Sequence, residues 1–495
     1  MDPEEYRKAG YAAIDYIIDY FKTMDERKVV ADVEPGYLRK LLPTEMPAEP
    51  EKFDDVHRDF ESKIVPGLTN WQSPNFLAFF PSNVSYPSML GELYSSAFSA
   101  PGFNWICSPA MTELETIVLD WLAKQMALPK CFLSDGEGMG IIQGSASESV
   151  ITCMVAARDR YLRDAVAAKY ETEEEKEEAI ASARGKLVAF ASDQTHSSTQ
   201  KAALIAGVRY IAIPTSAEEE YALTGARLEA ALAEAEAKGL MPFFLTASMG
   251  TTAVVAIDRF GEIAEVTKSR PQLWKHIDAA YAGAALVCPE HQHMLDGVED
   301  NYDSFDMNMH KWLLVNFDAS CMYVRRRRDL ADALSVMPPY LRNSVSDQGL
   351  VVDFRDYQLP LGRRFRALKV WFVMRTYGSS GLQEHIRRTS KIGELFTERV
   401  RARADLFAIV AKPRLGLTVF QVVAPGSSAG TEATNAVSKK VAARIEKEGQ
   451  LYLTSSTVHG AFAMRVVTGS PWATEGAMEE AYAYIEKVAE EERSE

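Results

Sequence analysis

Hydrophobic and polar residues follow two different periods along the middle of the chain. Short runs rich in β-branched and aromatic residues predict strands at Lys186–Phe190, Arg209–Ile213, Phe243–Ala247 and Leu273–Ile277. Apolar residues at helical spacing lie between these runs and predict helices at Ser149–Asp164, Thr199–Ala206 and Ala226–Lys238. Strands that alternate with helices need parallel crossover connections, so the pattern predicts an α/β fold whose mainly parallel sheet is covered by helices.

The two ends of the chain follow other patterns. The stretch Tyr6–Phe21 is amphipathic and predicts a helix whose apolar face packs on its own subunit or on a partner subunit. After Lys369 a long helix is followed by strands near Leu415–Val423 and Phe462–Val467 and by a final helix from Thr474. We therefore expect three regions: an N-terminal helical segment at 1–85, a large α/β domain at 86–368 and a small α+β domain at 369–495.

Composition and charge exclude several classes of protein. The 495 residues carry 54 basic and 69 acidic side chains, a formal charge of −15, which argues against nucleic acid or an anionic membrane as a partner. The sequence contains no run of about twenty apolar residues, which a membrane-spanning helix would need. The five cysteines form no CxxC pair, and the N-terminus is acidic without a following apolar stretch. These features predict reduced thiols and a cytoplasmic location.

The segment Asn308–Leu314 contains a lysine that is poorly placed to reach solvent. Lys311 lies between a histidine and a tryptophan, and an apolar run follows. Most lysines extend to water, so Lys311 alone is weak grounds for a site. Asp278, which ends a predicted strand thirty-three residues earlier, changes this interpretation. Ligands of open α/β sheets lie outside the carboxyl ends of the strands. Pyridoxal phosphate needs a lysine to bond its aldehyde and a carboxylate to keep its pyridine nitrogen protonated.

Two further segments could complete a cofactor site. Ser145, Ala146 and Ser147 precede the predicted helix at 149–164, and backbone N–H groups at a helix N-terminus bind phosphate. A serine-capped helix without a ligand has the same sequence. His196 follows a predicted strand and could stack on a cofactor ring, although a lone histidine is more often an ordinary hydrogen-bonded residue.

Other motifs do not support competing chemistry. The glycine-rich stretch Gly136–Gly140 does not have the GxGxxG spacing of a dinucleotide site. Gly144–Glu148 lacks the closing glycine of a nucleophile elbow. Glu290, His291 and His293 match no zinc spacing, so we expect no metal and regard them as surface residues.

Taken together, these segments resemble the aromatic-L-amino-acid decarboxylases, which include the Dopa, tyrosine and tryptophan decarboxylases. The resemblance covers nearly the whole chain and is carried by Phe103–Glu115, Asp278–Gly283, His310–Trp312 and Gly362–Arg366. It departs from the family pattern in minor ways at Cys107 and Met309. The resemblance implies the fold of pyridoxal-phosphate-dependent transferases of the aspartate aminotransferase type, a homodimer with shared active sites, and an N-terminal segment used in dimerisation.

The resemblance also implies roles for individual residues. Lys311 would bond the cofactor, Asp278 would pair with its pyridine nitrogen, and His196 and Ala280 would pack on its two faces. The phosphate would be surrounded by Ser145, Ala146, Ser147, Asn308 and His310. The run from Ser248 to Thr252 would pass close to the cofactor. Aromatic and apolar residues, some from the neighbouring subunit, would line the substrate pocket: Trp71, Phe79, Phe80, Pro81, Ser82, Pro101, Phe103 and Gly362.

The choice of reaction rests on Tyr340. In the family, a tyrosine at the position of Tyr340 protonates the substrate carbon after carbon dioxide leaves. Relatives with phenylalanine there tend to make aldehydes instead. The resemblance thus implies a carboxy-lyase that forms arylalkylamines; an aromatic aldehyde synthase and a noncatalytic relative that binds pyridoxal phosphate are the alternatives. Tyrosine-preferring plant relatives often carry serine at the position of Gly362, so glycine there fits an indole ring or Dopa. Phe79 offers no hydroxyl to a catechol or phenol, so tryptophan is expected first, then tyrosine, phenylalanine or Dopa.

Overall fold

The computed structural model describes residues 1–336 and 351–494 and divides the chain into two compact units. The large unit comprises Ser82–Ser390 and Ala411–Leu417. The small unit comprises Met1–Pro81, Lys391–Val410 and Thr418–Glu495.

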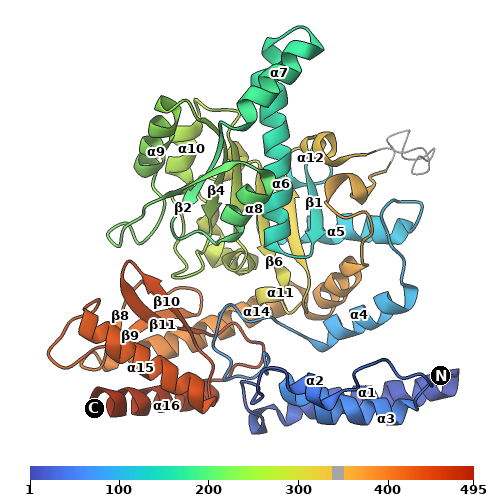
Figure 1. Cartoon of the computed structure of the whole chain (residues 1–495), viewed down its shortest axis with the longest axis vertical. Helices are drawn as coiled ribbons and strands as arrows, with labels where there is room; N and C mark the ends of the chain where they lie inside the picture. Colours follow the sequence, from blue (N-terminus) through green and yellow to red (C-terminus); the bar gives the residue numbers. More distant parts are fainter. Residues whose placement is uncertain (337–350, 495) are drawn as a thin grey trace. The chain divides into compact units, whose positions relative to one another are not determined.

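The large unit is built on a seven-stranded sheet (Figure 1) with strand order β1-β7-β6-β5-β4-β2-β3. Its strands are β1 (Met139–Gln143), β2 (Leu187–Ser192), β3 (Arg209–Ile213), β4 (Met241–Ser248), β5 (Trp274–Asp278), β6 (Ser304–Asn308) and β7 (Ser320–Val324). Strands β6, β5, β4, β2 and β3 pair in parallel, whereas β7 pairs antiparallel with both β6 and β1. The predicted mainly parallel α/β sheet is therefore confirmed, and β7 is its one reversed strand.

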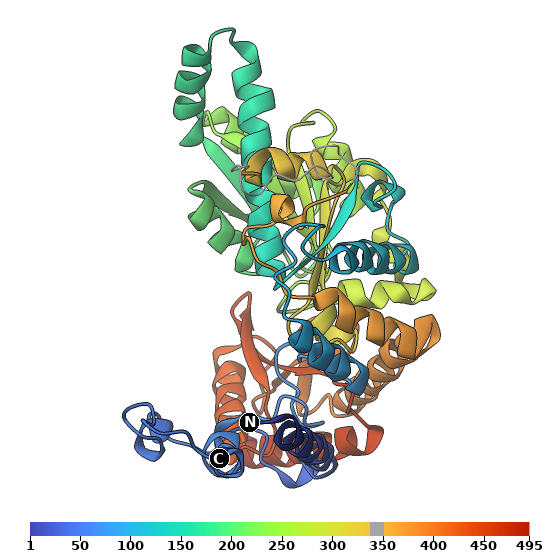
Figure 2. The same ribbon diagram turned by 90° about the vertical axis from the view of Figure 1, so that its right-hand side faces the viewer.

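Helices surround this sheet in the large unit. They are α4 (Tyr86–Phe98), α5 (Pro109–Gln125), α6 (Ala146–Tyr161), α7 (Glu173–Arg184), α8 (Ser198–Ala206), α9 (Gly225–Ala237), α10 (Phe260–Thr267), α11 (Met309–Trp312), α12 (Arg327–Leu334) and α14 (Arg366–Ala402). The end of α14, from Lys391 on, belongs to the small unit. Helix α6 packs on the sheet through Val150, Cys153 and Met154, which join a buried core with Phe244 and Trp274. The outer part of α6 and α7 extend beyond the sheet (Figures 1 and 2).

Local sequence accounts for the start of α6, which lies three residues before the predicted position. Ser145 caps the helix, because its side chain accepts a hydrogen bond from the backbone N–H of Glu148. The Glu148 carboxylate accepts a hydrogen bond of 2.8 Å from the backbone N–H of Gly144. The first turn of α6 is thus fixed by its own side chains, and it begins directly after the end of β1.

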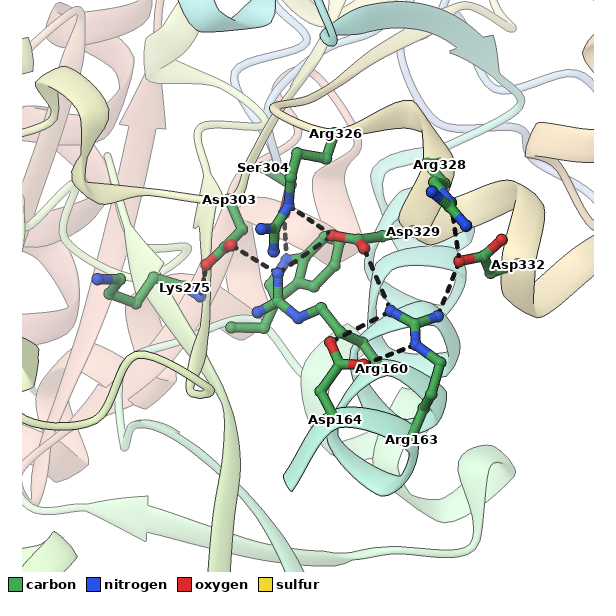
Figure 3. A network of polar contacts seen from close by, with 11 residues as sticks. Arg160, Arg163, Asp164, Lys275, Asp303, Ser304, Arg326, Arg328, Asp329 and Asp332 are labelled. Atoms are coloured by element: carbon green, nitrogen blue, oxygen red, sulfur yellow. Dashed lines mark hydrogen bonds and ion pairs between the residues drawn. The ribbon is translucent and has the colours of Figure 1, made fainter. Parts of the chain in front are cut away.

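A buried arginine joins α6 to the elements around α12 (Figure 3). Arg160 is 1% exposed, and its guanidinium forms ion pairs with Asp303 at 2.9 Å and Asp329 at 3.2 Å. The same guanidinium lies 4.5 Å from the centre of the Trp274 ring. Removing one partner of such a buried pair typically costs about 3 to 5 kcal/mol. The network therefore holds α12 against α6, immediately before residues 337–350.

The small unit contains the chain's second sheet. Its four strands have the order β10-β11-β9-β8; they are β8 (Phe407–Ile409), β9 (Leu417–Val422), β10 (Thr454–Val458) and β11 (Ala461–Val467). The helices of this unit include α1 (Pro3–Lys22), α2 (Tyr37–Leu41), α3 (Phe53–Asp59), α15 (Glu432–Glu448) and α16 (Glu475–Ser494). Phe396, Phe420 and Ile485 contribute to its core. This is the α+β region expected near the C-terminus, joined in one unit by the N-terminal helices.

The helices can be compared with membrane spans in length and composition. In residues 1–336 and 351–494, none combines the length and the apolar character needed to cross a bilayer.

Candidate active site

The sequence-predicted cofactor residues meet at one edge of the large sheet. Strands β2, β4, β5 and β6 run parallel, so their carboxyl ends lie at the same edge. Asp278 is the last residue of β5, and it pairs in register with Ser248 at the end of β4. Lys311 lies on α11, which follows β6 directly. Asp278 and Lys311 therefore come from neighbouring strand ends, as their sequence positions suggested.

His196 belongs to the same group. Its Nδ1 accepts a hydrogen bond of 3.2 Å from the backbone N–H of Ser198. The residue is exposed, yet enough protein surrounds its ring for desolvation to lower the pKa of His196. The Asp278 carboxylate opposes this shift and the Lys311 ammonium adds to it, so both charges lie within electrostatic reach of the imidazole.

The ends of β4 and β5 are held by a short polar network. The Ser248 hydroxyl lies 3.1 Å from that of Thr195, next to His196. The backbone N–H of Ser248 donates to the buried carboxylate of Asp258 at 2.6 Å. One Asp278 oxygen accepts a hydrogen bond of 3.0 Å from the backbone N–H of Ala280. These bonds fix the directions in which the strand-end side chains leave the sheet.

Gly250 allows the turn after β4 to lie close to the segment that follows β5. Its φ is +91°, and a Cβ added there would lie 2.6 Å from the Cβ of Ala282. A larger residue would push the turn away, so this position requires glycine. Thr252, further along the same turn, is exposed.

The N-terminus of α6 lies beside the end of β6. The backbone N–H of Ala146 donates to the side-chain oxygen of Asn308 at 3.0 Å. Ala146 and Asn308 are buried, whereas Ser147 is exposed. The N-terminus of α6, with its small side chains, thus lies at the strand edge that carries Lys311, and helix N-termini are places where phosphate groups bind.

His310 has a defined protonation state. Burial and, to a smaller extent, the neighbouring Lys311 charge together lower the pKa of His310 to about 4. Its Nδ1 accepts a hydrogen bond of 2.9 Å from the backbone N–H of Ala319. The neutral ring therefore carries its proton on Nε2, which makes Nε2 a hydrogen-bond donor.

Aromatic packing fixes the helical turn that carries Lys311. The Trp312 ring stacks on Tyr281 with centroids 4.7 Å apart and an interplanar angle of 11°. Trp312 Nε1 donates to Thr389 at 2.9 Å, and the Tyr281 hydroxyl donates to the backbone oxygen of Leu415 at 2.7 Å. These contacts fix the Trp312 side chain against Tyr281 and Thr389, so α11 is held in a defined orientation.

The predicted substrate residues fall into two groups. In the large unit, Pro101 and Gly362 line a cavity of about 640 Å³ together with Glu148. The backbone N–H of Arg363 donates to the Pro101 oxygen at 2.7 Å, which ties these two segments together. Ser82 and Phe103 also belong to the large unit.

The small unit contains the other group, namely Trp71, Phe79, Phe80 and Pro81. Trp71 and Phe79 stack with centroids 5.6 Å apart and an interplanar angle of 14°. The Trp71 and Phe79 side chains are 40% and 43% exposed. They form an accessible aromatic surface within that unit. Tyr340, the remaining predicted residue, lies outside the described residues.

Sequence reasoning missed several polar residues around the site. Glu115 and Arg363 form a buried ion pair of 2.7 Å, which joins two of the motif segments. Asp258 and the pair His276–Asp306 are buried beneath the strand ends. The alternation of side chains along β5 places His276 and Asp278 on the same face, which is the signal that would have identified His276.

The comparisons with known proteins agree with this geometry. Residues 35–423 match the pyridoxal-dependent decarboxylase conserved domain, and the chain belongs to that family. It is 42% identical over 491 residues to aromatic-L-amino-acid decarboxylase of Rattus norvegicus, covering 99% of this chain and 98% of the relative. It is 41% identical to phenylacetaldehyde synthase of Arabidopsis thaliana, covering 99% and 96% of the two chains.

A solved structure extends the agreement to the fold. The crystal structure of Oryza sativa TDC with PLP and tryptamine superposes with a TM-score of 0.93 at 38% identity, covering 99% of each chain. The sequence predictions of the family, of the pyridoxal-phosphate-dependent fold and of a carboxy-lyase are therefore confirmed, and the cofactor is pyridoxal 5'-phosphate.

Proposed function

We propose that this enzyme decarboxylates aromatic L-amino acids to arylalkylamines and carbon dioxide, with tryptophan preferred over tyrosine, phenylalanine and Dopa. The observation that carries the proposal is the meeting of Lys311, Asp278 and His196 at adjacent strand ends, in a chain of the pyridoxal-dependent decarboxylase family. The relative solved with tryptamine supports the preference for an indole side chain.

The residues at the strand edge fit pyridoxal phosphate. Bound there, the cofactor supplies an electron sink for the bond that breaks at the substrate α-carbon. In our proposal Lys311 holds the cofactor, and Asp278 keeps a proton on its pyridine nitrogen. His196 and Ala280 pack against the ring, with Ser248 and Thr252 nearby.

We propose that the phosphate-binding site lies at the N-terminus of α6. It would be formed by Ser145, Ala146 and Ser147 together with Asn308 and His310. The hydrogen bond from Ala146 to Asn308 supports this site, because it holds the first turn of α6 against the end of β6. The proton on His310 Nε2 supports it further, because a neutral donor can face a phosphate oxygen.

The proposed substrate-binding residues are mainly apolar and aromatic. Stacked Trp71 and Phe79, with Phe80 and Pro81, offer the flat apolar contacts that an aromatic side chain favours. In the large unit, the proposed substrate contacts are Ser82, Pro101, Phe103 and Gly362. Gly362 adds no side chain to the cavity it lines, which suits the larger indole.

Tyr340 is proposed to protonate the substrate α-carbon after carbon dioxide leaves, so that the product is an amine. The competing function is that of an aldehyde synthase, which the 41% identity to a phenylacetaldehyde synthase favours. Without a proton donor, the substrate carbon would react with oxygen and yield aldehyde, peroxide and ammonia. The product ratio therefore separates the two functions.

We expect the wild-type enzyme, given equal concentrations of the four amino acids in air, to form amines and to consume tryptophan fastest. The Tyr340→Phe variant keeps the aromatic ring but removes its proton, so amine formation should fall about 100-fold or more while aldehyde and peroxide appear. Mass detection of products together with oxygen monitoring measures both.

A matched control is Tyr170→Phe, which removes a hydroxyl from an exposed tyrosine and should leave the amine-to-aldehyde ratio unchanged. Mainly aldehyde from the wild-type enzyme would exclude the proposed reaction. Full amine production by Tyr340→Phe would exclude Tyr340 as the proton donor. The absence of any turnover with all four substrates would favour a noncatalytic relative.

We also propose that the enzyme is a cytoplasmic homodimer with shared active sites. Helix α1 has no buried residue, and Tyr6, Tyr11 and Ile14 on it are exposed. In the large unit, Leu93 and Phe98 of α4 are exposed as well. Exposed apolar side chains on each of these helices favour a protein partner. The scattered free cysteines support a reducing compartment.

Light scattering should therefore give twice the mass of one chain. Sharing of residues is tested with heterodimers of one Lys311→Ala subunit and one Tyr340→Phe subunit, isolated through different tags. If Tyr340 acts across the interface, one site in each heterodimer is intact and amine production recovers to about half of the wild-type rate. A monomeric mass would contradict the dimer, and a stable heterodimer without recovery would show that Tyr340 serves its own subunit.

A further inference from the structure

A histidine and an aspartate are completely buried together beneath the end of β5. His276 on β5 and Asp306 on β6 are both 0% exposed. His276 Nε2 lies 3.6 Å from an oxygen of Asp306, slightly longer than a hydrogen bond. On the other side of the ring, Nδ1 lies 2.8 Å from the Ser304 hydroxyl, which also accepts a hydrogen bond from Trp274 Nε1. The ring is therefore held in place with Nε2 directed at the carboxylate.

Burying the charged carboxylate of Asp306 is unfavourable unless a neighbouring group balances its charge. Neither of its oxygens has a hydrogen-bond partner among the described residues. A buried carboxylate without hydrogen bonds is costly unless it is protonated or paired with a cation. Asp306 also pairs in register with Asp278 on the neighbouring strand, so two carboxyl groups lie side by side on one face of the sheet. Two adjacent buried carboxylates disfavour each other's ionisation.

The charges around the pair point to His276 as the compensating cation. Burial alone lowers the pKa of His276, but the Asp306 carboxylate and the Cys153 thiol on α6 reverse this, and the pKa is raised overall. Burial and the Asp278 charge raise the pKa of Asp306, while His276 and the Lys311 charge on α11 lower it. On β7, burial raises the pKa of Cys321 and the Asp306 charge raises it further, so Cys321 stays a neutral thiol. Because the pKa of His276 is raised, the imidazolium persists at neutral pH and is lost only at higher pH.

We propose that His276 carries a positive charge that neutralises Asp306, so that the Asp306 charge does not oppose the pairing of Asp278 with the cofactor's pyridine nitrogen. This rests on the proposed role of Asp278. His276 and Asp306 are positioning residues in this scheme, because they act on the cofactor through Asp278 and do not touch it. Their contribution is to keep the net charge beneath Asp278 at zero.

This assignment predicts an asymmetric response to substitution. In Asp306→Asn the histidine loses its anion and becomes neutral, so the net charge of the pair stays at zero. In His276→Gln the Asp306 carboxylate has lost its cation, so an unbalanced buried charge lies next to Asp278 unless Asp306 takes up a proton at a cost. The double variant His276→Gln/Asp306→Asn again has no net charge. The damage caused by His276→Gln should therefore be repaired by a second substitution.

Equilibrium dialysis of the full-length holoenzymes against graded pyridoxal phosphate gives the cofactor Kd of each protein. We expect His276→Gln to weaken binding about tenfold or more, and Asp306→Asn and the double variant to stay within about threefold of the wild type. A purely structural role for His276 predicts equal losses in the single and double variants, and that result would overturn the proposal.

A second measurement does not depend on the His276→Gln variant folding. In holoenzyme labelled with ¹⁵N-histidine, the His276 signal should report protons on both ring nitrogens at pH 7.5 in the wild type, and on only one in Asp306→Asn. A neutral His276 in the wild type would refute the ion pair. If the imidazolium is found but Asp278→Asn leaves the cofactor Kd unchanged, the proposed role of Asp278 fails and the link to the cofactor is withdrawn, while the ion pair stands.

Discussion

Replacing Lys311 with alanine should abolish decarboxylation and leave the cofactor without a covalent bond to the protein. Lys311 lies on α11 between buried His310 and Trp312, and the contacts of those two side chains set the direction of this turn. Loss of a covalent catalytic group typically lowers kcat by at least about a thousandfold. On gel filtration, the cofactor, detected by its visible absorbance, should then elute separately from the variant protein.

The matched control for this experiment is Lys268→Ala. Lys268 is an exposed lysine of the same unit that pairs with Glu265 at the surface, so its loss should change neither absorbance nor rate. Borohydride reduction of the wild type followed by peptide mapping should find the cofactor on Lys311. A cofactor adduct on another lysine, or retained turnover in Lys311→Ala, would contradict the assignment.

Asp278→Asn should lower kcat about 100-fold or more with little change in KM. The substitution keeps the shape of the side chain and its place at the end of β5, but it removes the carboxylate that we propose holds a proton on the pyridine nitrogen. An unprotonated pyridine is a poor electron sink, so the loss falls on the chemical step and not on substrate binding. Steady-state kinetics with the preferred amino acid measure kcat and KM separately.

An exposed aspartate provides the comparison. Asp135→Asn makes the same chemical change on the surface of the large unit and should leave kcat unaltered. A near-normal kcat in Asp278→Asn would remove this residue from the mechanism. A raised KM at unchanged kcat would instead indicate that Asp278 contributes to substrate binding.

The sequence by itself determined the α/β architecture and the approximate positions of β2, β3, β4 and β5. Strand β3 has the predicted bounds Arg209–Ile213, and the predicted β5 differs by one residue at each end. These elements were predictable because buried strands and amphipathic helices impose a local period on hydrophobic residues. The place of Asp278 at a strand end follows from the same pattern, and the parallel crossovers then bring it near the segment of Lys311.

Other features depended on chain segments that no local pattern connects. The reversal of β7 between β1 and β6 was not predicted, since a strand's apolar pattern does not record its direction. Glu115 and Arg363 are far apart in sequence and pair only because α5 and the segment before α14 meet in the large unit. The proton on His310 Nε2 is set by the backbone N–H of Ala319 nine residues later.

The pairing of His276 with Asp306 is the clearest case of a feature decided by tertiary structure. The period of two along β5 places His276 on the face of Asp278, but the sequence gives no indication that β6 lies next to β5 in the register that joins His276 and Asp306. Only the folded sheet, closed over by α6, excludes water from both groups and turns two ordinary side chains into a charged pair. The sequence thus predicted which chemical groups lie at the strand ends, and the tertiary structure decides their charges, because charge depends on burial and on neighbours that are distant in the chain.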